Sequence, residues 1–121
     1  MSLDDLNARV TDAILAAERL PPGSREAEEA FRKVGLIEEE IAAALAVDDV
    51  EGEIARVGAV TAALSAHDPL HALLLVDRYL AVGISGQGAA KLESLRAEAE
   101  AMLDAGRGTT VSPVTFTLQA A

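Results

Sequence analysis

The sequence predicts an all-α protein: a single-domain bundle of four to five antiparallel helices with an extended C-terminal tail. Apolar residues recur at three- and four-residue steps through most of residues 1–106, which is the period of amphipathic helices. Short runs rich in Pro, Gly, Ser and Asp separate these segments, as helix caps and loops do. The 121 residues are enough for one domain with its own hydrophobic core.

The most apolar stretch, residues 69–83, predicts a central helix that neighbouring helices bury on several sides. Asp68 is a good N-cap, Pro69 suits the first helical position, and Gly83 supplies the left-handed residue that ends many helices. Asp77 and Arg78 interrupt the apolar run. A buried charge needs a partner, so we expect an ion pair with a neighbouring helix or a subunit contact.

Three amphipathic helices are expected before this stretch. The first covers residues 3–20 with Ser2 as its cap, and the second runs from a cap at Ser24 to about residue 47. The third begins after Asp48, which stands in capping-box spacing with Glu51. Their apolar stripes suit antiparallel neighbours joined by short loops.

A fifth helix is expected to follow residues 84–88 and to end at Gly106. We therefore divide the chain into a helical bundle (1–106) and an extended tail (107–121). In the tail, apolar residues alternate with threonines, which is the two-residue period of a strand. The strand candidates are Val114, Phe116 and Leu118. Such a strand can pair with a second chain, whereas a frayed chain end is the simpler alternative.

Composition excludes several classes of function. The formal net charge of -10 argues against binding nucleic acid or an anionic membrane through the general surface. The chain has no cysteine, so it has neither a disulfide framework nor a thiolate site. It shows no signal peptide and no membrane-spanning stretch, so we expect a cytoplasmic protein. The 50% apolar content is high for a small monomer, which favours burial against another chain, including a second copy.

Acidic residues concentrate in the second helix and the turn that follows it. Residues 26–53 hold ten acids and two bases, so half of the 20 acids lie in less than a quarter of the chain. One interpretation is a docking face for a basic protein partner, and the other is a solvated helix face. The candidate partner-binding acids are Glu38, Glu39, Glu40, Asp48, Asp49, Glu51 and Glu53.

Two local patterns approach known binding motifs without completing them. Residues 48–53 alternate acids as a calcium loop does, but the glycine falls at the wrong position. Residues 86–91 open a helix with two glycines, yet they lack the preceding strand of a dinucleotide fingerprint and the spacing of a phosphate loop. We expect no cofactor.

His67 and His71 are the only histidines, and their four-residue spacing can place two imidazoles on one metal ion. However, Pro69 starts the helix between them, so His67 is expected to lie outside it. There is no HExxH motif and no Ser–His–Asp signature. We therefore predict no metal site and no catalytic residue.

These observations favour a non-enzymatic protein–protein interaction module: an adaptor, an assembly factor or a structural subunit of a larger complex. The first alternative is an acidic inhibitor, such as an immunity protein or antitoxin, that masks a basic effector and binds it in a salt-sensitive manner. The second alternative is a small helical enzyme using His67, His71, Asp77 or Tyr79, which requires these side chains to converge in one pocket.

Overall fold

The computed structural model describes the backbone of residues 1–119 and the side chains of residues 1–106. Within that backbone the chain is all-helical, which confirms the predicted fold class. The five helices are α1 (Leu3–Glu18), α2 (Arg25–Ala44), α3 (Val50–Ser65), α4 (Pro69–Ala81) and α5 (Gly86–Gln119). None of the described helices combines the length and the apolarity that a bilayer crossing needs.

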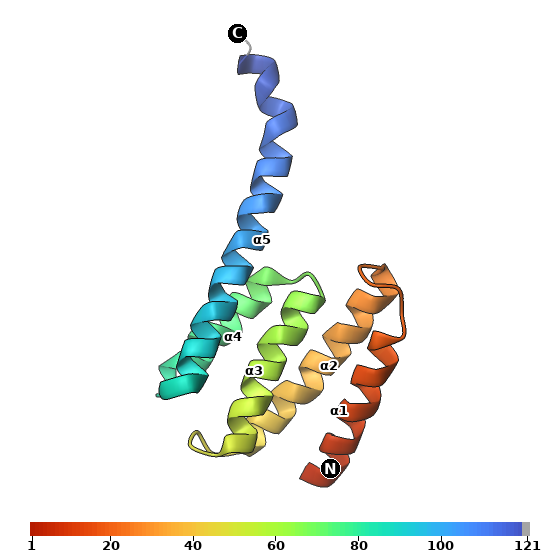
Figure 1. Cartoon of the computed structure of the whole chain (residues 1–121), viewed down its shortest axis with the longest axis vertical. Coiled ribbons are helices and arrows are strands. Elements are labelled where there is room, and N and C mark those ends of the chain that lie inside the picture. The colour runs from red at the N-terminus through yellow and green to blue at the C-terminus, as the bar shows by residue number, and fades with distance from the viewer. Residues whose placement is uncertain (120–121) are drawn as a thin grey trace.

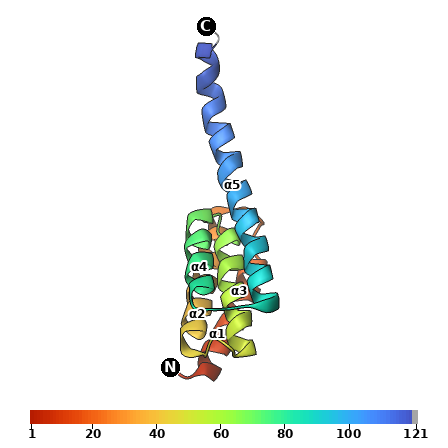
Figure 2. The same ribbon diagram turned by 90° about the vertical axis from the view of Figure 1, so that its left-hand side faces the viewer.

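Successive helices run antiparallel and lie next to one another (Figure 1). α1 packs on α2, and α2 packs on α3. α3, α4 and α5 each pack against the other two, and Figure 2 shows α4 and α5 side by side. The helices α3, α4 and α5 thus form a three-helix cluster. α2 packs on α3 and α1 packs on α2, so these two helices extend the cluster as a layer, and α3 separates α2 from α4.

Side-chain caps fix the starts of the first four helices. Ser2 forms a complete capping box on α1, Ser24 accepts from the Ala27 N–H, and Asp68 Oδ1 accepts from the His71 N–H at 3.2 Å. The predicted cap of α3 was wrong by one residue. Asp49, not Asp48, is the N-cap, and its Oδ1 accepts the Glu51 N–H at 2.8 Å.

α3, rather than the apolar stretch 69–83, lies at the centre of the fold. It packs against three other helices, whereas α4 packs against α3 and α5 and leaves Leu70 67% and Leu74 52% exposed. The expectation that the stretch 69–83 forms the central helix was therefore wrong, although two neighbouring helices do pack against α4. The physical reason is side-chain size: small residues on α3 let neighbouring helices approach closely. A Cβ on Gly35 of α2 would lie 3.4 Å from the Cβ of Ala62.

α5 also differs from the expectation. Its backbone is helical to Gln119, and it extends beyond the other helices (Figure 1). Gly106 does not adopt a positive φ, unlike Gly83, so it does not end the helix. A glycine in a right-handed conformation costs helix stability without stopping the helix. The side chains of the strand candidates Val114, Phe116 and Leu118 lie outside the described residues, and the division at residue 106 stays a prediction.

Candidate functional site

An open groove of about 650 Å³ lies between α2 and α4, with α3 as its floor. We call it the α2–α4 groove. Its apolar lining comes from Leu36, Ala42, Ala43, Leu45, Val47 and Val82, and its polar lining comes from Glu39, Glu40, Arg56, Arg78 and Tyr79. Leu36 on α2 is 57% exposed, and Val82 at the end of α4 is about half exposed. Large apolar side chains that stay exposed beside a hollow commonly mark a binding surface.

Arg56 on α3 is the buried charge of the groove, with only 3% of the residue exposed. Its Nη2 donates to the Ala46 carbonyl at 2.8 Å and its Nη1 donates to the Val47 carbonyl at 3.4 Å. No carboxylate among the described side chains forms an ion pair with it. The partial negative charge at the C-terminal end of α2, just before these carbonyls, favours a cation at this position.

Tyr79 on α4 is 8% exposed and lines the same groove. Burial, followed by the negative charge of Glu39, raises the pKa of Tyr79 to about 12, although Arg78 and Arg56 oppose the shift. No hydrogen-bond partner for its hydroxyl is found among the described side chains and backbone. The hydroxyl therefore sits in a largely buried position where charges from α2, α3 and α4 act on it.

Two histidine–glutamate pairs connect the start of α4 to α2. His71 Nε2 lies 2.8 Å from Glu39 Oε2, and His67 Nδ1 lies 3.4 Å from Glu28 Oε2. His67 precedes α4 and has a φ of 56°, so it lies outside the helix, as expected. The two imidazoles thus contact different carboxylates, and the described residues contain no group of three or more His, Cys, Asp or Glu fit for a metal ion.

The residues of the enzyme alternative are spread over separate environments. Asp77 forms the expected ion pair with a neighbouring helix, since its Oδ1 lies 2.9 Å from Arg96 Nη1 on α5. Tyr79 lines the α2–α4 groove, His71 lines a separate cavity of about 30 Å³, and His67 is exposed beside Glu28. The structure does not bring these four side chains into one pocket.

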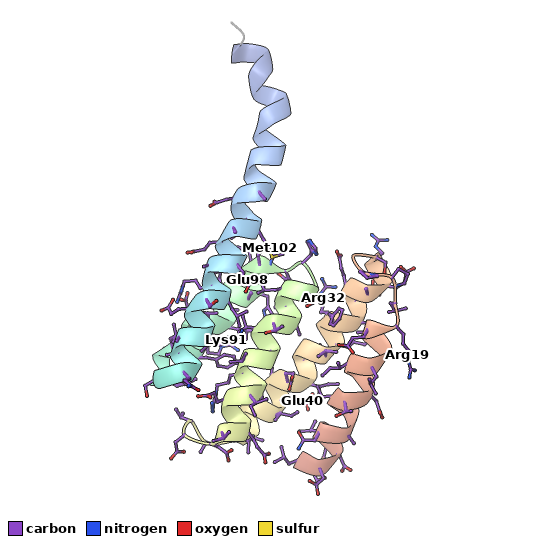
Figure 3. All side chains as sticks on the ribbon, in the orientation of Figure 1. Arg19, Arg32, Glu40, Lys91, Glu98 and Met102 are labelled. Atoms are coloured by element: carbon purple, nitrogen blue, oxygen red, sulfur yellow. The ribbon has the colours of Figure 1, made fainter. Side chains whose placement is uncertain are left out.

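The candidate partner-binding acids have different local surroundings. Glu39 and Glu40 line the α2–α4 groove, and Glu40 projects from α2 in Figure 3. Glu38 lies against Gly58 of α3, where burial raises the pKa of its carboxyl, and Glu53 lies against Gly88 of α5.

The three acids at the loop between α2 and α3 have different roles. Asp49 is occupied as the cap of α3. Asp48 and Glu51 are exposed. The docking face built from the seven acids stays a prediction.

Sequence reasoning missed the residues that define the groove. Arg56 is an isolated cation within the Ala- and Val-rich run of α3, which signals a charge held inside the fold. Leu36 falls outside the apolar stripe of its helix, which signals an apolar side chain left on the surface. Neither signal shows that the two residues line the same hollow, because they lie on different helices.

Comparisons with protein-family models, with curated proteins and with solved structures find no match for this chain. The function is therefore argued from the groove and its chemistry, since a fold class alone does not define an activity.

Proposed function

We propose that this protein is a non-enzymatic protein–protein interaction module and that the α2–α4 groove is its docking surface. The observation that carries this proposal is the exposure of Leu36 and Val82 on opposite walls of a groove of about 650 Å³. Apolar walls with a few polar groups on the floor are typical of sites that bind a complementary segment. An adaptor, an assembly factor and a structural subunit all use such a surface, and we place the protein in the cytoplasm.

A groove between two helices, with a third helix below it, suits a peptide segment more than a flat protein surface. The walls offer apolar area for one face of the segment, and the polar floor fixes its register. Binding through few, well-placed anchors concentrates the free energy in the residues that fill the hollow. A charge placed on Leu36 should therefore abolish docking, because the apolar contact is lost and an uncompensated charge is buried.

The acidic inhibitor remains the second candidate, and a specific observation favours it. Glu40, Asp48 and Glu51 are exposed near the C-terminal end of α2 and the loop that follows. A basic partner on these acids would associate faster at low salt, because exposed charges are screened within about 10 Å at 0.1 M ionic strength. Docking into the groove through Leu36 and Val82 lacks this dependence.

A peptide-display experiment tests the docking surface directly. A phage library of random twelve-residue peptides is selected on the full-length protein, and the enriched peptides are titrated by fluorescence polarisation. Leu36→Asp should weaken binding by tenfold or more, whereas Leu15→Asp should leave it unchanged. Leu15 is the matched control because it is a leucine of similar exposure on α1, away from the groove.

Two results would contradict the proposal. One is the absence of any enriched peptide. The other is a set of peptides that bind the wild type and Leu36→Asp equally well, which would place the docking surface elsewhere. Circular dichroism is the folding control: both variants should retain their helical content, because the substitutions lie at exposed positions.

A further inference from the structure

The α3 and α4 sides of the groove carry hydrogen-bond donors that have no carboxylate partner among the described side chains. A guanidinium carries five N–H donors. The described contacts of Arg56 use two carbonyls of the loop after α2 and no carboxylate. Since Arg56 is 3% exposed, its positive charge is held away from bulk water without a counter-ion. Such a charge is costly unless an anion completes its environment.

Two more donors lie beside it. Arg78 is exposed on the rim of the groove and has no ion pair among the described side chains. The Tyr79 hydroxyl is buried and has no described hydrogen-bond partner. Arg56, Arg78 and Tyr79 all line the same groove, where the hydroxyl feels the charges of both arginines as well as those of Glu39 and Glu38.

The acids of the opposite wall do not neutralise these donors. Glu39 Oε2 lies 2.8 Å from His71 Nε2, so its carboxylate already has a partner. Glu38 lies against Gly58 outside the groove, and Glu40 is exposed at the edge. Among the described side chains, neither of the two arginines that line the groove forms an ion pair with these acids.

We propose that the segment docked in the α2–α4 groove carries one side-chain carboxylate, Asp or Glu, between apolar residues. This inference rests on the proposed function and adds the chemistry of the partner. The carboxylate accepts hydrogen bonds from Arg56, Arg78 and the Tyr79 hydroxyl, and the flanking apolar side chains pack against Leu36 and Val82. Charge-assisted hydrogen bonds of this kind are about twice as strong as neutral ones.

The same enriched peptides test this inference. Peptides that depend on Leu36 are expected to share one Asp or Glu flanked by Leu, Ile, Val or Phe. Replacing that acid with its amide should weaken binding to the wild type by tenfold or more, because hydrogen bonds to a charged group are stronger than those to a neutral one. Arg78→Gln should weaken the acidic peptide several-fold and leave its amide form nearly unaffected.

Tyr79→Phe provides a second variant that removes only the hydroxyl and keeps the packing of the ring. It should weaken the acidic peptide about threefold to fivefold, as expected for one hydrogen bond. Arg19→Gln is the control, because Arg19 follows α1 and points away from the bundle (Figure 3). It should change neither affinity.

The salt dependence of the association rate distinguishes an acidic partner from a basic one. The chain carries a net charge of -10, which repels an acidic peptide at long range. Raising the ionic strength should therefore leave its association rate unchanged or increase it, whereas a basic peptide would associate more slowly.

The failure of this inference and the failure of the proposed function give different results. Enriched peptides that require Leu36 but carry Lys or Arg, or bind equally well as amides, would overturn the carboxylate partner and leave the docking surface intact. Enriched peptides that bind Leu36→Asp as tightly as the wild type, or the absence of any enriched peptide, would overturn both the carboxylate partner and the docking surface.

Discussion

Arg56 Nη2 lies 2.8 Å from the carbonyl oxygen of Ala46, so the central helix α3 holds the loop that follows α2. The same guanidinium forms part of the floor of the α2–α4 groove. One buried side chain thus has two consequences: it fixes the end of one groove wall, and it places a positive charge in the groove that we propose as the docking surface. A Cβ on Gly52 would come within 2.8 Å of Nη2, so α3 leaves space for this arrangement.

Replacing Arg56 with methionine should destabilise the protein by roughly 1 to 2 kcal/mol. The substitution removes hydrogen bonds to Ala46 and Val47 while it keeps most of the buried side-chain volume. The exposed loop carbonyls can rehydrate, which limits the loss. Urea unfolding followed by circular dichroism measures the change, with Arg19→Met as the exposed control. An unchanged unfolding midpoint would show that Arg56 does not hold this loop.

The raised pKa of Tyr79 predicts that the folded protein loses stability at alkaline pH. Its pKa is raised from 10.0 to about 12, so the folded state keeps the phenol proton after the unfolded state has lost it. The stability contribution is complete below pH 10 and is lost as the pH rises to about 12, with a total on the order of 2 kcal/mol.

This titration can be followed directly, because Tyr79 is the only tyrosine in the chain. The ultraviolet absorbance of tyrosinate reports its pKa, and denaturation at each pH reports the stability. Tyr79→Phe should remove this part of the alkaline loss. A tyrosine that titrates near pH 10 in the folded protein would contradict the burial of this side chain as the cause of a raised pKa.

Glu38→Gln should stabilise the protein at pH 7 by roughly 0.5 kcal/mol. Burial against Gly58 raises the pKa of Glu38, so the ionised carboxylate costs stability that the neutral amide does not. The gain should be present above the folded pKa and should vanish below the ordinary value of 4.5. Glu29→Gln, at an exposed position of the same helix, should show no gain at any pH. A gain that persists at acidic pH would point to a cause other than desolvation.

Gly58→Ala should also stabilise the protein, by up to about 1 kcal/mol, because alanine is the better helix former. A Cβ at residue 58 meets the carboxylate end of Glu38, which is flexible and can turn toward solvent. The carboxylate is then hydrated, so the benefit of Glu38→Gln should disappear in the Gly58→Ala background. Thermal unfolding of the two single variants and the double variant gives this coupling. Full additivity would show that the two side chains do not compete for space.

The predictable part of the fold is local. Asp68 and Pro69 start α4 as expected, and Asp77 reaches Arg96 on a neighbouring helix. Both features follow from short-range chemistry that the sequence displays. The central position of α3 does not, because its burial depends on how closely small alanines let other helices approach. By hydropathy, the leucine-rich α4 is expected to be the more buried of the two helices, although two of its leucines stay exposed.

The groove could not be predicted from the sequence, and the reason is different. Its walls come from α2 and α4, which are separated in the chain by α3, and its floor depends on which way Arg56 points. The acids of residues 38–53 are clustered in the sequence, yet their local contacts differ, since Glu38 lies against Gly58 and Asp49 caps α3. Composition predicts a protein partner, and the α2–α4 groove is where we propose that it docks.

The most direct measurement of the docking surface is a nuclear magnetic resonance titration of the isotopically labelled full-length protein with an enriched acidic peptide. We predict that the amide signals of Leu36, Val47 and Val82 and the side-chain Nε–H signals of Arg56 and Arg78 shift together, while those of α1 stay in place. Shifts confined to α1 or to the exposed acids Asp48 and Glu51 would contradict the α2–α4 groove as the site of docking.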